Sequence, residues 1–177
     1  MDTNRLTFAA ITAKTVVVHT ITYFIVGLLA FTIFDYTARF AETGLSSYMR
    51  PTDDPLVMAG PLFQPIRGVL FGVVFYLLRD VFFGKKNGWL TMWIVLVVLG
   101  VLSTFGPSPG SFEGLIYTTV PLGGHLFGLI EVFVQSLLLS VVLLYWITHP
   151  EKRWITWVLG TSLVIVLLLP TLGLLAG

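Results

Sequence analysis

Apolar side chains fill five stretches of the chain almost without interruption, and most polar residues gather between these stretches. They cover residues 14–34, 65–83, 89–105, 124–148 and 154–175. A helix that crosses a bilayer needs about 20 mostly apolar residues, and all five stretches reach or approach this length. A backbone exposed to lipid must satisfy its own hydrogen bonds, and the stretches lack the alternating pattern of barrel strands. The pattern therefore predicts five membrane-spanning α-helices.

The composition agrees with a membrane protein. Of the 177 residues, 56% are hydrophobic and 11% are charged, whereas a soluble domain carries roughly 25% charged residues. The first apolar run, Thr15 to Phe34, exceeds the roughly 7–15 residues of the apolar region of a signal peptide, so we expect it to be a retained helix. We expect residues 1–177 to form a single transmembrane domain.

The basic residues predict the orientation of the helices. Seven of the ten precede the first helix or mark the two short turns after the second and fourth helices. They are Arg5, Lys14, Arg79, Lys85, Lys86, Lys152 and Arg153. The positive-inside rule places these positions in the cytoplasm, with the N-terminus inside and the C-terminus outside. The expected location is an inner (plasma) membrane of bacterial type.

The two outer loops, 35–64 and 106–123, are rich in proline and glycine. Because proline fixes φ and permits few conformations, these loops are expected to be structured rather than slack. The predicted fold is an all-α bundle of five transmembrane helices, N-in and C-out, with two structured outer loops.

Glu131 is the acidic residue that lies deepest within a predicted helix. Gln135 follows one turn later, and Gly124 and Gly128 lie on the same face. Acidic residues inside membranes are costly, and they are usually functional or paired. The alternatives are a binding or proton-handling role and a structural role, as an interhelical ion pair or as a protonated acid bonded to Gln135.

Arg67 is the expected partner of Glu131, because it lies near the predicted outer start of the second helix. Gln64 lies one turn earlier on the same face. An arginine side chain suits a carboxylate or a phosphate, since its planar fork donates two parallel hydrogen bonds. The structural alternative is that Arg67 extends to the outer interface.

Other polar residues of the outer side could join this site. Arg39 and Arg50 in the first outer loop could close over an anion, although a solvated loop of mixed charge is the structural alternative. His125 lies at the outer mouth of the fourth helix. The adjacent Asp53 and Asp54 are weak evidence for a divalent metal, so no metal site is predicted.

His19 is expected to stay apart from this site. It lies about five residues from the predicted cytoplasmic end of the first helix, roughly 15 Å in depth from Glu131, and we interpret it as a hydrogen-bonded structural residue. The three histidines, His19, His125 and His149, fall at three depths, and the chain has no cysteine. No cofactor is predicted.

The leading functional hypothesis is binding or transport of an anionic small molecule or lipid headgroup in an outward-facing pocket, with membrane lipids around it and a homo-oligomer possible. The site residues would be Arg67, Glu131, Gln135, Gln64, Arg50, Arg39 and His125. One alternative is a membrane-embedded enzyme acting on a lipid-type substrate, although no catalytic motif names its residues. Another is a non-catalytic accessory subunit or assembly factor of a larger membrane complex. The net charge of +1 argues against a nucleic-acid partner.

Overall fold

The computed structural model describes residues 6–35 and 49–176, and all regular structure within these ranges is helical. The long helices are α1 (Phe8–Phe34), α4 (Gly60–Leu77), α8 (Leu122–Thr148) and α9 (Arg153–Ala176). The helix α6 (Gly88–Val97) continues into the π-helical segment η3 (Val98–Leu102). Three short helices lie at the ends of the long ones: α3 (Pro55–Met58), α5 (Arg79–Phe82) and α7 (Phe112–Tyr117).

Four of these helices, α1, α4, α8 and α9, are long and apolar enough to cross a membrane. This agrees with the membrane protein expected from the sequence. The α6–η3 segment is apolar but shorter, with 15 residues from Gly88 to Leu102. At 1.5 Å per residue it would be about 22 Å long, less than the roughly 30 Å hydrocarbon thickness of a typical bilayer.

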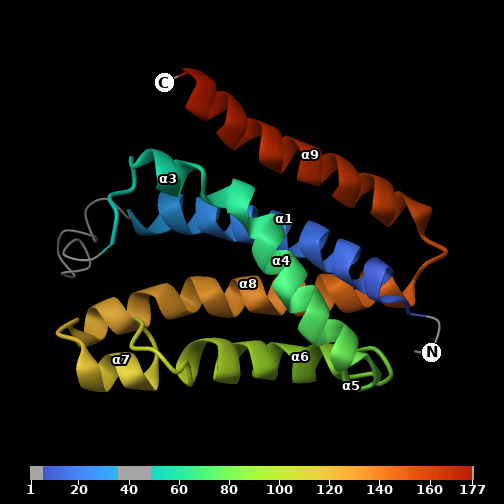
Figure 1. Cartoon of the computed structure of the whole chain (residues 1–177), viewed down its shortest axis with the longest axis horizontal. Coiled ribbons are helices and arrows are strands. Elements are labelled where there is room, and N and C mark those ends of the chain that lie inside the picture. Colours follow the sequence, from blue (N-terminus) through green and yellow to red (C-terminus); the bar gives the residue numbers. More distant parts are fainter. Residues whose placement is uncertain (1–5, 36–48, 177) are drawn as a thin grey trace.

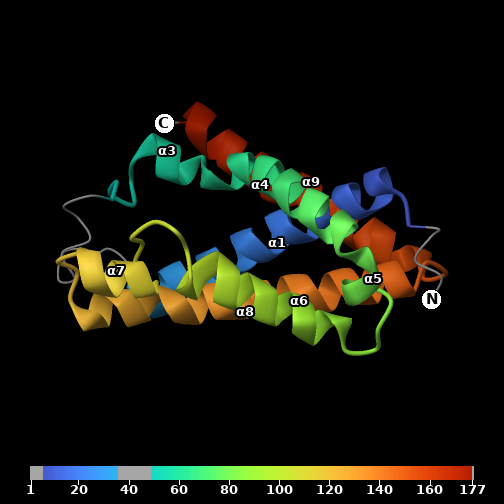
Figure 2. The same cartoon turned by 60° about the horizontal axis from the view of Figure 1, so that its bottom comes forward.

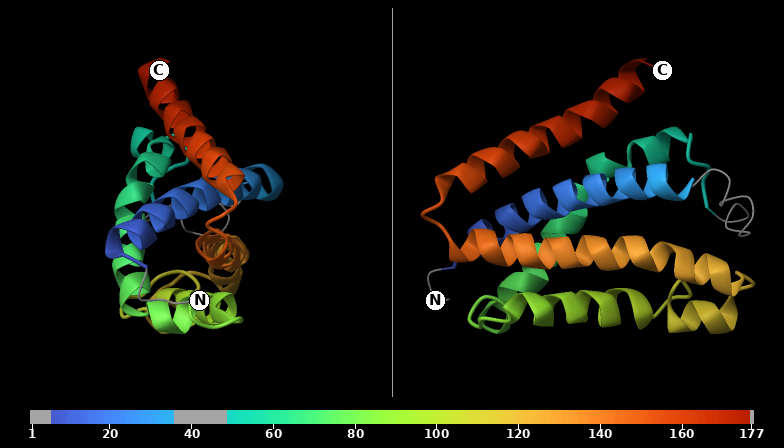
Figure 3. Two further views of the ribbon diagram at one scale, coloured as in Figure 1. Left: turned by 90° about the vertical axis from the view of Figure 1, so that its right-hand side faces the viewer. Right: turned by 180° about the vertical axis from the view of Figure 1, so that it is seen from behind.

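The helix α1 is the centre of the assembly. It packs against α4, α8 and α9, while α6 packs against α8 (Figure 1). The α5–α6 turn, the α8–α9 turn and the start of α1 lie at one end, and α3, α7 and the end of α9 lie toward the other (Figures 1 and 2). The segments α1, α4, α6–η3, α8 and α9 therefore run alternately in opposite directions. Seen end-on and from behind, α9 leans away from the other helices toward its C-terminal end (Figure 3).

Two helices begin earlier than the apolar pattern indicated. The helix α1 starts at Phe8 rather than at Lys14, and α4 starts at Gly60 rather than at Pro65. The two prolines explain why the start of α4 was predicted too late. Pro61 lies in the first turn, where no backbone N–H is needed, and Pro65 is accommodated inside the helix. Part of the predicted loop 35–64 is therefore helical, and Arg67 lies about 10 Å inside α4 by the helical rise.

The end that holds the two short turns is fixed by a basic side chain and a tryptophan. The Nζ atom of Lys14 donates to the Trp146 carbonyl at 3.2 Å and lies 5.0 Å from the centre of the Trp146 ring. The indole N–H of Trp146 in turn donates to Thr156 Oγ1 at 3.1 Å. These contacts join α1, α8 and α9. They also satisfy a carbonyl in the last turn of α8, where the helix itself offers no donor.

Two glycines of α4 bring its backbone directly against that of α1. A Cβ atom added to Gly68 would lie 2.7 Å from the Val16 Cα, and one added to Gly72 would lie 2.7 Å from the Thr12 Cα. The glycines are four residues apart, as are the two positions they meet on α1, so the backbones touch along one face. The sequence suggested a small face at Gly128, but a Cβ atom there would meet nothing within 4 Å.

We therefore predict that Gly72→Ala destabilises the protein, because the new methyl group must push α1 and α4 apart. Overpacking of this kind costs about 1–3 kcal/mol. Gly160→Ala in α9 is the matched control, since its Cβ atom would meet nothing within 4 Å. Thermal unfolding of the detergent-solubilised protein should show a lower Tm for Gly72→Ala only; equal Tm values would contradict the direct backbone contact.

Candidate functional site

A buried polar pair joins α1 to α4 near the middle of α1. The Nε2 atom of His19 lies 3.1 Å from Gln64 Oε1, and the Gln64 amide nitrogen donates to the Gly60 carbonyl at 3.2 Å. A carbonyl can only accept, so the NH₂ of Gln64 must face Gly60 and its oxygen must face His19. His19 therefore donates through Nε2. This histidine is 1% exposed.

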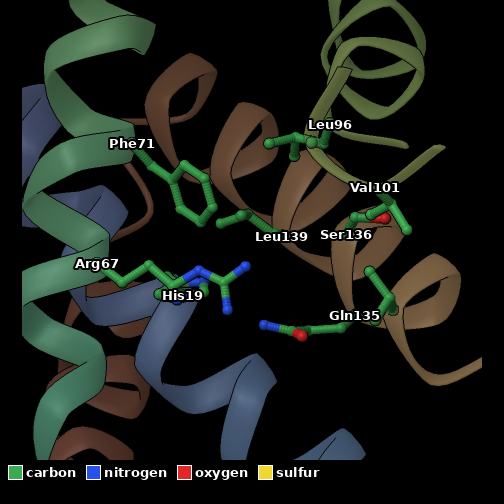
Figure 4. Close-up of a pocket in the computed structure, with 10 residues that line it drawn as sticks. His19, Arg67, Phe71, Leu96, Val101, Gln135, Ser136 and Leu139 are labelled. Carbon is green, nitrogen blue, oxygen red and sulfur yellow. The ribbon is translucent and has the colours of Figure 1, made fainter. Parts of the chain in front are cut away.

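A cavity of about 70 Å³ lies beside this pair, enclosed by α1, α4, α8 and the α6–η3 segment (Figure 4). Its polar lining residues are His19, Arg67, Gln135 and Ser136. Its apolar walls include Phe71, Leu96, Val101, Val132 and Leu139. The four helices thus bring together polar residues that the sequence places on three separate segments.

Arg67 and Gln135 face each other across the cavity. The guanidinium of Arg67 points toward the amide of Gln135, which lies midway along α8 (Figure 4). The Arg67 guanidinium carbon is 5.4 Å from the centre of the Phe71 ring, one turn further along α4. This cation–π contact positions the guanidinium beside the cavity.

Glu131 lies one turn from Gln135 and packs against α1. Its Oε1 atom is 3.6 Å from the position of a Cβ atom on Gly27, so the glycine leaves room for the carboxyl group. Tyr23, one turn before Gly27, is within electrostatic reach of both Glu131 and Arg67. The salt bridges within 4.0 Å among the described residues do not include the expected pair of Arg67 and Glu131.

His125 belongs to a different part of the structure. It is 2% exposed, its Nδ1 accepts a hydrogen bond from the Gly110 N–H at 3.1 Å, and its Nε2 lies 3.4 Å from Thr118 Oγ1. Because Nδ1 accepts from a backbone N–H, the ring proton must be on Nε2. Gly110 has a positive φ of 86°, a conformation that glycine adopts without strain. His125 therefore anchors the loop before α8 and does not line the cavity.

Arg50 lies outside the cavity as well. Arg50 donates to Asp54 Oδ2 at 3.0 Å, and the Asp54 carboxylate caps α3 by accepting from the Leu56 N–H at 2.8 Å. The hydrogen bond from Leu56 and the one from Arg50 lower the pKa of Asp54 below its usual range. Arg39 falls outside the described residues. Among the described residues, no three His, Asp or Glu side chains gather as metal ligands.

The structure thus selects a smaller site than the sequence indicated. It places Arg67, Gln135 and Gln64 around one polar centre, puts Glu131 at its edge, and adds His19. The sequence interpretation excluded His19 because it placed the start of the first helix six residues too late, which put the histidine close to the cytoplasmic end. The available signal was the polar face of this helix, where His19 and Tyr23 are spaced one turn apart.

Comparisons with protein families, curated proteins and solved structures find no match to this chain.

We predict that His125→Ala disorders the segment from Ser108 to Thr118, because a buried backbone N–H loses its acceptor. An unsatisfied buried group costs about 1–3 kcal/mol. Hydrogen–deuterium exchange should become faster in this segment. The control is His149→Ala at the far end of α8, where the ring bonds only to Tyr145 and Thr148. Unchanged exchange at Gly110 in the His125 variant would contradict the anchoring role.

Proposed function

We propose that this chain is an integral membrane protein that binds a small anionic group in the cavity beside Arg67. The observation that carries the proposal is the position of Arg67. Its guanidinium lines the cavity from a position well inside an apolar helix, and its side chain remains exposed in the isolated chain. An arginine at the centre of a membrane helix costs about 2.5–3.5 kcal/mol on insertion scales. A bound anion would offset that cost.

The other polar groups of the cavity suit the same ligand. The Gln135 amide faces Arg67 and can donate a hydrogen bond to an anion held between them. Ser136 donates to the Phe133 carbonyl at 3.1 Å, and Gln64 accepts from His19, so both of these groups are already engaged. Arg67 and Gln135 are therefore the proposed ligand-binding residues, and His19 and Gln64 hold α1 and α4 in place around them.

The volume of the cavity limits the size of the anionic group that it can enclose. Pockets that enclose small organic ligands usually measure about 300–1,000 Å³, and this cavity measures about 70 Å³. One water molecule needs at least about 10–15 Å³ by such a measure. The cavity therefore has room for a carboxylate or phosphate group, but it cannot enclose a whole metabolite.

We also propose that the chain crosses the membrane five times, with the N-terminus in the cytoplasm. The opposite directions of consecutive helices support this arrangement, because α6–η3 connects the end that holds α5 to the end that holds α7 (Figure 1). Basic residues in the α5–α6 and α8–α9 turns then lie on the cytoplasmic side.

We predict that carboxylate or phosphate raises the Tm of the protein in non-ionic detergent, and that Arg67→Gln abolishes this shift. A ligand at one hundred times its Kd stabilises by about 2.7 kcal/mol. Arg79→Gln is the matched control, because the Arg79 guanidinium also lies over an aromatic ring, 4.7 Å from the centre of Tyr76, at the other end of α4. A shift that is equal in both variants would be a general salt effect and would refute the site.

The topology can be tested with single cysteines, since the natural chain has none. We predict that Lys86→Cys and Glu151→Cys react with a membrane-impermeant maleimide only from the cytoplasmic side. Gly106→Cys should react only from the outside, and a Cβ atom at this position meets nothing within 4 Å. Labelling of Lys86→Cys and Gly106→Cys from the same side, with Glu151→Cys on the opposite side, would show that α6–η3 does not cross the membrane.

A further inference from the structure

We infer that the anionic group is the carboxylate of a long-chain fatty acid, whose acyl chain lies in the bilayer outside the cavity. This inference rests on the proposed anion site and adds the class of ligand and the side from which it enters. It follows from the shape of the cavity, the direction in which it opens, the apolar surface around its rim and the local charge.

The cavity is a recess with a buried floor and an exposed rim. His19, Ser136 and Leu139 on α1 and α8 are buried, whereas Arg67 on α4 and Gly100 on η3 are exposed. The opening therefore lies between α4 and η3. These helical segments form the side of the bundle, where a membrane protein meets lipid rather than water.

The flanking helices separate on the side of η3. The helix α4 lies close to α6 near the α5 turn, and the two diverge toward α3 and α7 (Figures 1 and 2). The π-helical segment η3 lies on the diverging part. A Cβ atom added to Gly100 would meet nothing within 4 Å, so the rim has open space at this point. A chain-shaped ligand could approach Arg67 past the exposed Gly100.

Apolar side chains surround the rim. Phe63 and Leu70 are four residues before and three residues after Arg67, on the same side of α4, and they are 50% and 63% exposed. Leu99, beside Gly100, is 64% exposed. A ligand whose charged end reached Arg67 would therefore extend its remaining length over an apolar surface. An amphiphile with a small charged headgroup has an apolar chain that can cover this surface, whereas a free inorganic ion has none.

A carboxylate suits the charge and the geometry of Arg67. Arg67 supplies one positive charge to the cavity, and the Glu131 carboxyl group lies one turn from Gln135. A carboxylate is a monoanion, so it balances the single charge of the arginine. The planar carboxylate also matches the two parallel N–H groups of the guanidinium fork.

The test measures binding of hexadecanoate by the full chain in non-ionic detergent, from the ligand-dependent thermal shift. Acetate has the same charged group without the chain, methyl hexadecanoate has the same chain without the charge, and phosphatidylglycerol and inorganic phosphate represent the phosphate sources. The variants are Arg67→Gln, Gly100→Leu at the rim, and Gly160→Leu as a control. A Cβ atom meets nothing within 4 Å at either glycine, so both leucine variants should fold.

We expect hexadecanoate to act at concentrations at least tenfold lower than acetate, and methyl hexadecanoate to have no effect. Arg67→Gln should abolish the shift. Gly100→Leu should weaken hexadecanoate binding at least tenfold and change acetate binding less than twofold, while Gly160→Leu should change neither.

Three outcomes would overturn the inference in distinguishable ways. If acetate binds as well as hexadecanoate and Gly100→Leu affects neither, the anion site stands and entry from the bilayer is refuted. If phosphatidylglycerol displaces hexadecanoate and binds more tightly with the same dependence on Arg67, the ligand is a phospholipid headgroup. If no anion shifts the Tm in a manner that depends on Arg67, the proposed function fails together with the inference.

Discussion

The direct contact between the backbones of α1 and α4 is the constraint on which the other features depend. Lipid gives apolar helices little hydrophobic reason to associate, so close packing must supply the attraction. Gly68 and Gly72 permit this packing because they have no side chains to separate the helices. Once α4 lies against α1 at this distance, Gln64 meets His19, and the hydrogen bond between them fixes the register of the two helices.

This register also determines where the charge of Arg67 is placed. Glycine occupies the face of α4 that touches α1, so the arginine, which lies on an adjacent face, is directed beside the contact rather than into it. Phe71 contacts its guanidinium, and the floor of the cavity comes from α1 and α8. The polar centre is therefore a result of helix packing. It is not formed by any one helix, which explains why its residues are dispersed along the chain.

The loop before α8 illustrates a different use of polar residues. Ser111 is 0% exposed, and its hydroxyl accepts from Ser108 and Gly114 while donating to the Ser108 carbonyl. Together with His125, it satisfies backbone groups that a loop rich in proline and glycine cannot pair by itself. The polar residues of this loop stabilise its fold, whereas the side chains of Arg67 and Gln135 point into the cavity.

The sequence by itself determined the helical class and the membrane-spanning lengths of most helices, and it identified Arg67 and Gln135 as candidate site residues, because hydropathy and isolated polar residues are local properties. It misjudged the starts of α1 and α4, since a basic residue and two prolines resemble helix boundaries when their surroundings are unknown. Only the tertiary structure decided that His19 lies at the cavity and that His125 belongs to a loop. The partners of these histidines are distant in sequence, and their proximity depends on how closely α1 and α4 pack and on how the loop folds back on α8.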